Sequence, residues 1–229
     1  MDIAAALNFT FQDKEWFKKL LIPALLTLTG LGFVLVLGWF LEIIRRVARQ
    51  DPAHVPGWSD PGRYLGSGIQ VCIVLFLLLA PAALLIAVPG SAAFLVEQTV
   101  NDPQILESFQ LLFWALTFLG AAMYLSLIGL IMPPVFGLLA VTGRLDQALN
   151  PANVIRLIRS NPRYAVTAWL VPIAVHLVVY LLSSSVFCVG VFFGLVYTLT
   201  ATGHLYGQFY LNATISQLGN DIMVFPSYD

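Results

Sequence analysis

The chain has 229 residues, of which 59% are hydrophobic and 10% are charged, and its formal net charge is −1. A soluble domain has about a quarter of its residues charged, so this composition excludes an ordinary water-soluble protein. The near-neutral charge and the scattered short clusters of basic residues also argue against a nucleic-acid surface, and we expect no nucleic-acid partner.

The apolar segments predict an all-α, polytopic transmembrane helical bundle. Residues 164–220 contain no Lys, Arg, Asp or Glu, a pattern that only a hydrocarbon environment tolerates over such a length. The apolar runs are continuous rather than alternating, which excludes a transmembrane barrel. Windows of about twenty apolar residues predict about five spans, near residues 19–44, 65–88, 109–132, 164–187 and 189–211. We expect one transmembrane domain over 1–211, followed by a tail over 212–229.

Two of these spans contain residues that interrupt helices. The first contains Thr27, Thr29, Gly30 and Gly32, and an irregular helix around them is one of two explanations for the basic residues before this span. The other is that Lys14, Lys18 and Lys19 snorkel to a lipid headgroup layer. The third runs into Pro133 and Pro134, which lack backbone donors, so a kink or a helix end is expected there.

The arginines predict the orientation in the membrane. One group follows the first span and another follows the third, whereas the loop around Glu97, Asp102 and Glu107 has no basic residue. By the positive-inside rule we expect a multi-pass protein of the cell membrane with its arginine-rich loops in the cytoplasm. Five spans would then place the amino terminus outside, although the nearby Lys14, Lys18 and Lys19 disagree with that placement.

Two segments have the character of membrane-interface elements. In the segment after Asn150-Pro151, apolar residues recur at helical spacing, which predicts a helix in the interface with Val154, Ile155 and Ile158 towards lipid. Its lipid-interface residues would be Arg156, Arg159 and Arg163. The second element is the loop 56–62, in which Trp58 is expected to anchor at headgroup level.

A weak copy of the interfacial leader precedes the first span. A shift of 148 residues places Asp2 on Asn150 and Asp13 on Asn161, and each leader is followed by an apolar span with a proline in its first turns. If the match reflects a duplication, the two units would be inverted in the membrane. Chance similarity of two amphipathic leaders explains it equally well.

The last two spans contain the polar and small residues that stand out within the membrane. His176, His204 and Gln208 are the polar intramembrane candidates, and the glycine pairs Gly203/Gly207 and Gly190/Gly194 have the spacing of helix-packing sites. One hypothesis is that the two histidines approach one cavity and ligate a haem or a chlorophyll-type pigment. The alternative, which we favour, is that each is a neutral histidine hydrogen-bonded within the helix bundle.

The chain resembles a large family of bacterial and archaeal membrane proteins that is known only as a domain of unknown function. The matching strings are residues 11–16 before the first span, Gly38, 45–47, 56–60, Gly68, 156–164 and the terminal Gly203-His204-Leu205-Tyr206-Gly207-Gln208. The resemblance implies no activity, substrate or catalytic residue. The string Val55-Pro56-Gly57-Trp58 departs from the family, which more often has an acidic residue before the tryptophan.

No nucleophile with its base, carboxylate pair or metal-ligand set is recognisable at a known spacing, so we expect neither an enzyme nor a metal site. The sequence favours an accessory, scaffold or assembly subunit that packs against lipids and a membrane protein partner, or that forms a homo-oligomer. The alternatives are a small uncoupled permease or lipid-handling protein, and a haem- or pigment-binding subunit that uses His176 and His204.

Overall fold

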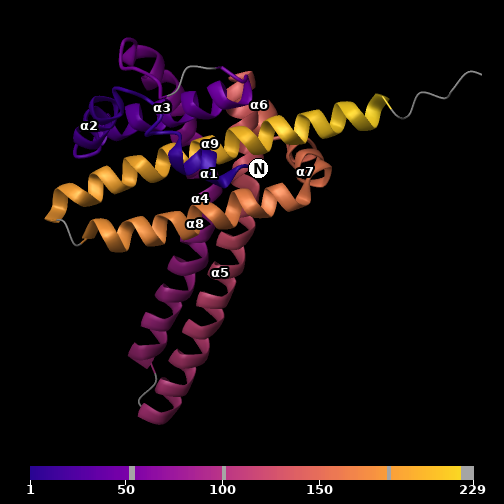
Figure 1. Ribbon diagram of the computed structural model, residues 1–229. Helices are drawn as coiled ribbons and strands as arrows, with labels where there is room; N and C mark the ends of the chain where they lie inside the picture. Colours follow the sequence, from indigo (N-terminus) through magenta and orange to yellow (C-terminus); the bar gives the residue numbers. More distant parts are fainter. Residues whose placement is uncertain (52–54, 100–101, 185–186, 223–229) are drawn as a thin grey trace, which may run out of the picture. The chain divides into compact units, whose positions relative to one another are not determined.

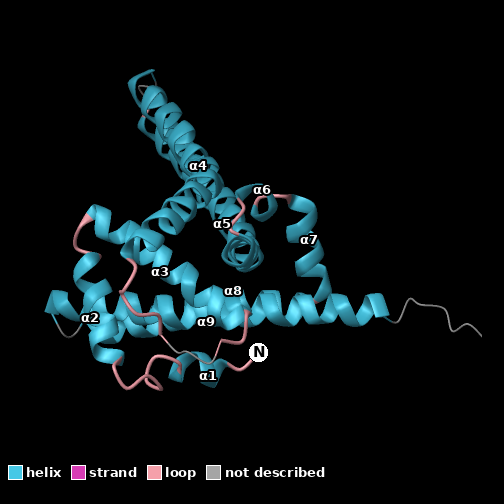
Figure 2. Ribbon diagram, turned by 90° about the horizontal axis from the view of Figure 1, so that it is seen from above, coloured by secondary structure: helices cyan, strands magenta, loops and turns pink. Residues whose placement is uncertain are grey.

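The computed structural model describes residues 1–51, 55–99, 102–184 and 187–222, and within these ranges the chain forms nine helices and no strand (Figures 1 and 2). This confirms the all-α prediction. The helices are α1 (Ile3–Asn8), α2 (Trp16–Leu26), α3 (Gly30–Ala48), α4 (Pro61–Thr99), α5 (Pro103–Thr142), α6 (Leu145–Ala148), α7 (Pro151–Ser160), α8 (Pro162–Ser184) and α9 (Phe187–Ile222).

The chain divides into two compact units. The first comprises residues 1–72 and 130–229, and the second comprises residues 73–129. The single domain expected over 1–211 and the tail expected over 212–229 stay predictions. Helix α9 continues to Ile222.

Helix α9 is the centre of the first unit, where it contacts α1, α2, α3, α7 and α8. Figure 1 shows α8 and α9 side by side over much of their length. Five side chains of α9 that lie on several of its faces are buried: Val196, Ala201, Leu205, Phe209 and Ala213. A helix buried on several faces must itself be largely uncharged, which accounts for the part of the uncharged run that α9 contains.

The first predicted span, near residues 19–44, is two helices rather than one, and the break lies where an irregularity was suggested, around Thr27, Thr29, Gly30 and Gly32. Helix α2 ends at Leu26 and α3 begins at Gly30. The hydroxyl of Thr29 accepts a hydrogen bond from the Gly32 amide at 3.1 Å, and that of Thr27 donates to the Ala24 carbonyl at 2.7 Å. These side chains satisfy backbone groups that a continuous helix would have paired, so they favour a break.

Three helices in the described part of the chain are long and apolar enough to cross a membrane, namely α4, α5 and α8. Helix α5 passes through Pro133 and Pro134 and continues to Thr142, so of the kink or helix end expected at these prolines the helix end is excluded. Membrane helices tolerate internal prolines because neighbouring groups satisfy the freed carbonyls. The remaining two of the five expected spans correspond to the broken α2–α3 segment and to the central α9.

Helices α3 and α4 make a close contact in the first unit through two glycines. A Cβ atom on Gly38 would overlap the Tyr64 carbonyl, and one on Gly68 would overlap the Val34 carbonyl. Backbone atoms cannot move aside as a flexible side chain can. The two helices therefore lie this close only because both positions lack a side chain.

The second unit is a hairpin made of the end of α4 and the first two thirds of α5. The hydroxyl of Tyr124 on α5 donates to the Leu78 carbonyl on α4 at 3.0 Å. Most large apolar side chains of this unit are exposed, among them Phe76, Leu84, Phe94, Leu111, Leu112, Leu116, Phe118, Leu119 and Met123. Such a surface suits lipid or another membrane protein rather than water.

We expect Gly68→Ala to destabilise the protein by about 1–3 kcal/mol, the usual cost of forcing a group into a filled site. The matched control is Gly66→Ala on the same helix, where an added Cβ atom meets no heavy atom within 4 Å. The control should be neutral or slightly stabilising, because alanine favours helix more than glycine does. Thermal unfolding of both variants in detergent measures the difference. Equal melting temperatures would contradict the close α3–α4 contact.

Candidate functional site on helix α9

The residues of the string 203–208 contact three different neighbours. Gly203 and Gly207 face α3: a Cβ atom on Gly207 would lie 2.6 Å from Val47 Cβ and 2.9 Å from the Ile44 carbonyl oxygen. A Cβ atom on Gly203 would lie 3.1 Å from Ile43 Cγ2. The approach is therefore tighter at Gly207, where backbone is in the way, than at Gly203, where a side chain is.

A second face of the same string meets α5. Tyr206 stacks on Phe136 with ring centroids 6.2 Å apart, and Phe40 of α3 meets both rings edge-on. A Cβ atom on Gly137 would lie 2.7 Å from Tyr210 Cδ2. Three aromatic rings and one glycine therefore fix the last turns of α5 against α9 and α3.

The third face binds the amino-terminal segment. The Gln208 side-chain oxygen accepts from the Asp2 amide at 2.8 Å, and its nitrogen donates to the Asp2 carbonyl at 3.1 Å. The same nitrogen lies 3.1 Å from His204 Nδ1, which must accept because an amide nitrogen only donates. Phe9 packs on the His204 ring at a centroid distance of 4.7 Å. Both His204 and Gln208 are thus engaged by residues 2–9.

Nearer the start of α9, the amino-terminal segment makes two more polar contacts through residues 7 and 10. The hydroxyls of Thr10 and Thr200 lie 2.7 Å apart and are buried, and the Tyr197 hydroxyl donates to the Leu7 carbonyl at 3.0 Å. Residues 197, 200, 204 and 208 recur every three or four positions, so they form one stripe on α9. This stripe is the site of the amino-terminal segment.

Gly194, from the other glycine pair, faces α8 instead. A Cβ atom there would lie 2.9 Å from Ser183 Oγ and 3.0 Å from Val179 Cγ1. Gly190 lies one turn earlier on α9, next to the residues 185–189 whose side chains are outside the described part. Gly194 therefore faces α8, whereas Gly203 and Gly207 face α3, and the packing role of Gly190 stays a prediction.

His176 lies on α8 and is oriented within its own helix. Its Nδ1 atom is 2.8 Å from the Pro172 carbonyl oxygen, so Nδ1 carries the proton and donates. The ring lines a cavity between α8 and α9 together with Gly194 and Thr198. His204, whose ring faces Phe9, is not among the residues lining that cavity. The structure thus places the two histidines against different neighbours.

The lipid-interface arginines all lie on exposed positions of α7 and the first turn of α8. Arg156 donates to the Asn153 side chain at 2.9 Å. The apolar face of α7 differs in part from the one expected, because Val154 is buried together with Leu157, whereas Ile155 is exposed and Ile158 is partly exposed. Val154 therefore packs on protein rather than lipid, since α7 lies against α9 and α8.

Trp58 is held by protein contacts as well as being part-exposed. Its ring stacks on buried Trp39 at a centroid distance of 5.9 Å, and its indole nitrogen donates to the Lys19 carbonyl at 3.4 Å. Trp39 in turn donates to the Pro56 carbonyl at 2.9 Å. The loop is thus fastened to α2 and α3, and the lipid-anchor role of Trp58 stays a prediction.

Glu42 on α3 is the centre of a charged cluster that the sequence analysis missed. Its carboxylate lies 2.7 Å from Arg45, 3.4 Å from Arg46 and 3.0 Å from Arg63 of α4. Only 8% of the Glu42 side chain is exposed, against 51% for Arg63. Burial lowers the pKa of the Arg45 guanidinium, and Glu42 opposes that shift. The spacing Glu42, Arg45, Arg46 at i, i+3 and i+4 was the available signal.

Arg45 of this cluster also helps to satisfy the carbonyl groups at the carboxyl end of α5. Arg45 donates to the Ala140 carbonyl at 2.6 Å, Arg49 to the Val141 carbonyl at 3.5 Å, and Gln70 of α4 to the Gly143 carbonyl at 3.3 Å. The last carbonyls of a helix have no partner within it, and cations near them are favourable. Both arginine-bearing segments expected on one membrane side therefore meet at the end of α5.

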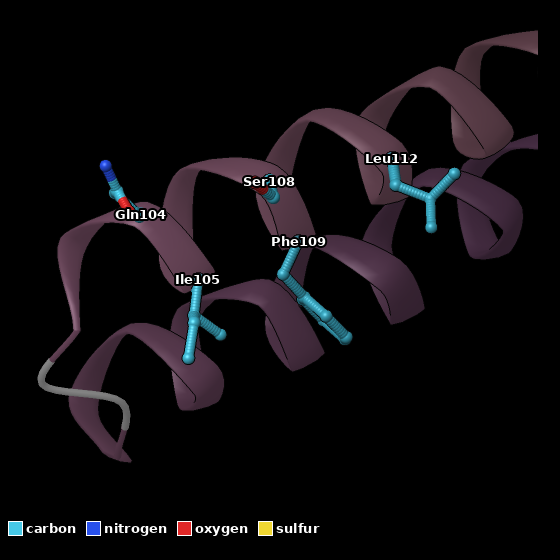
Figure 3. Close-up of a pocket in the computed structure, with 5 residues that line it drawn as sticks. All are labelled: Gln104, Ile105, Ser108, Phe109 and Leu112. Carbon is cyan, nitrogen blue, oxygen red and sulfur yellow. The ribbon is translucent and has the colours of Figure 1, made fainter.

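The second unit contains an open depression of about 460 Å³ on the first turns of α5, lined by Gln104, Ile105, Ser108, Phe109 and Leu112. Figure 3 shows Ile105 and Phe109 projecting to one side of the helix. Among the described residues, no group of three or more His, Cys, Asp or Glu is placed to hold a metal ion.

Comparison with known proteins identifies the family. Residues 21–188 match the model of a family described as "Protein of unknown function (DUF4013)". The chain belongs to the DUF4013 family. The match ends before the Gly203–Gln208 string and begins after the amino-terminal segment that this string binds. No curated protein and no solved structure matched the chain.

We expect Gly207→Leu to prevent correct packing of α9 on α3, because the added side chain would meet the Ile44 backbone. His204→Gln should have a far smaller effect, since a glutamine still offers an acceptor to Gln208 near the same place. Yield of monodisperse protein on size-exclusion chromatography is the measurement. Equal behaviour of the two variants would refute the packing role of the glycine.

We expect Glu42→Gln to cost about 3 kcal/mol, because it leaves the Arg45 guanidinium half buried without its carboxylate. The control is Asp146→Asn, which removes the exposed Arg144–Asp146 pair. That hydrogen bond lowers the pKa of Asp146, but both side chains face solvent, so unfolding should not change measurably. Thermal unfolding of the two variants that shows no difference would argue against a structural role for Glu42.

Proposed function

We propose that this member of the DUF4013 family is a non-catalytic accessory or assembly subunit of the cell membrane, which packs against a partner membrane protein. The observation that supports this most directly is the exposed apolar surface of the hairpin 73–129. The hairpin leaves most of its large apolar side chains uncovered.

The hairpin also has a place where a partner side chain would fit. A depression of about 230 Å³ between α4 and α5 is lined by Leu85, Pro89, Phe113, Leu116, Thr117 and Gly120. A Cβ atom on Gly120 would meet no heavy atom within 4 Å. Membrane helices associate through small residues that admit a neighbour closely, so we infer that a partner helix, or a second copy of this chain, inserts an apolar side chain at Gly120.

The charged residues fit the same proposal. Between Arg63 and Arg144 the sequence has three charged residues, all acidic and all near the hairpin tip: Glu97, Asp102 and Glu107. We infer that the tip lies outside and that the arginines, including Arg156, Arg159 and Arg163, contact anionic lipid on the cytoplasmic side. In this proposal the protein needs no haem, pigment or metal.

The test combines native mass spectrometry with site-specific crosslinking. Full-length protein is extracted from its own membrane in a mild detergent, and a photoreactive phenylalanine analogue replaces Leu116 in the depression. The control replaces Leu177 on α8, because both leucines are 60% exposed. We expect a stoichiometric partner or a dimer that crosslinks from position 116 and not from position 177.

Gly120→Leu sharpens this test. The site is open, so the variant should fold normally but lose the partner, whereas the equally open Gly66→Leu should keep it. A lone chain that carries only a small-molecule or lipid mass, with lipid crosslinks at both positions, would refute the proposal. That result would favour the uncoupled permease or lipid-handling function, and a visible absorbance would favour the haem- or pigment-binding one.

A further inference from the structure

The cavity between α8 and α9 is distinct from the packing sites described above. Its volume is about 200 Å³, and its lining is apolar except for a few side chains. It is lined by His176, Val179, Tyr180, Ser183, Val191, Gly194, Leu195 and Thr198. Tyr180, which is 61% exposed, lies at its edge, so the cavity opens to the surrounding membrane.

Most hydroxyl groups in this cavity already have partners. Ser183 donates to the Tyr180 carbonyl at 3.2 Å, and Thr198 donates to the Leu195 carbonyl at 2.8 Å, each within its own helix. Such bonds satisfy a hydroxyl without any ligand. These two hydroxyl groups therefore need no hydrogen bond from a molecule in the cavity.

His176 differs from these hydroxyl groups in the hydrogen bonding of its second ring nitrogen, Nε2. Because Nδ1 donates to the Pro172 carbonyl, a neutral ring has its lone pair on Nε2. No hydrogen bond from a described residue reaches Nε2. An acceptor without a donor is costly in an apolar environment, so the cavity has a site that a donor from outside the chain would complete.

The depth of this atom restricts the ligand. His176 is eight residues before the end of α8 and fourteen after its start, which is about 12 Å and about 21 Å along the helix. Half the hydrocarbon layer is about 15 Å thick. A phospholipid keeps its polar groups at the surface and has no donor along its acyl chains, so it cannot supply the missing hydrogen bond.

The geometry points to a lipophilic alcohol or phenol as the occupant, and we propose that its hydroxyl donates to His176 Nε2 while its apolar body fills the α8–α9 cavity. The volume is below the about 300–1,000 Å³ of pockets for drug-sized molecules. It suits one ring or a short branched chain, with any longer tail leaving past Tyr180 into lipid. A haem or chlorophyll-type pigment is far larger.

The test compares each hydroxyl compound with its methyl ether, which keeps the shape and removes the donor. Farnesol and decylhydroquinone represent the two sources, an isoprenoid alcohol and a phenol. Binding to the detergent-purified full-length chain is titrated by native mass spectrometry. We expect one equivalent of the alcohol, the hydroquinone or both to bind about tenfold more tightly than the corresponding ether, as loss of one hydrogen bond predicts.

His176→Phe keeps the ring and removes the acceptor, so it should reduce the ratio of hydroxyl to ether affinity to about one. Thr198→Val is the matched control on the opposite wall and should leave the ratio unchanged. The comparison of each hydroxyl compound with its ether is made first on the unaltered protein, so this part of the test stands even if a variant does not fold. Equal affinity for hydroxyl compound and ether, or a ratio that survives in His176→Phe, would overturn the proposal. A ratio lost in Thr198→Val and not in His176→Phe would do so as well.

Discussion

The close approach of α9 to α3 at Gly207 is the contact on which the rest of the first unit depends. A Cβ atom on Gly207 would lie 2.6 Å from Val47 Cβ and 2.9 Å from the Ile44 carbonyl oxygen. This contact fixes both the distance between the axes of α3 and α9 and the register of one helix along the other. Register then decides which residues of α9 face each neighbour: the stripe that includes His204 and Gln208 faces the amino-terminal segment, Tyr206 and Tyr210 face α5, and Gly194 faces α8. A helix with so many occupied faces tolerates few changes of side-chain size.

The Glu42 cluster shows why this packing also requires charges. Helix α3 approaches α4 through Gly38 and Gly68, and the end of α5 through Arg45. The close contact leaves the final carbonyls of α5 facing protein, where unpaired polar groups are costly. Arg45 and Arg49 supply donors, and Glu42 compensates the positive charge of Arg45. The arginines that set the expected topology are therefore also the residues that close the helix junction.

The sequence predicted the helical class and the apolar segments, because composition and hydrophobic spacing depend on local rules. It offered the break at Thr27–Thr29, where hydroxyl capping outweighs hydrophobicity, only as one explanation of the lysine distribution, and it left open whether α5 kinks or ends at Pro133 and Pro134. Glu42 was missed although it lies within the first predicted span, and its partner Arg63 lies on another helix that spacing along the sequence does not bring near. Gly207 contacts α3 and His204 contacts the amino-terminal segment. Which neighbour each residue contacts depends on the tertiary arrangement, and residue spacing along the chain does not specify that arrangement.

The capping residues bear on the suggested duplication of the interfacial leader. Asp2 and Asn150 both cap the helix that follows them, accepting from Ala5 and Ala152, and Asp13 and Asn161 both accept from a backbone amide two or three residues on. Both leaders also pack on α9. The elements after them diverge, because α8 runs through Pro172 without a break whereas α2 ends before Thr29 begins α3. The equivalence is thus confined to the leaders, where one polar residue at each end is enough to specify a short helix lying against α9.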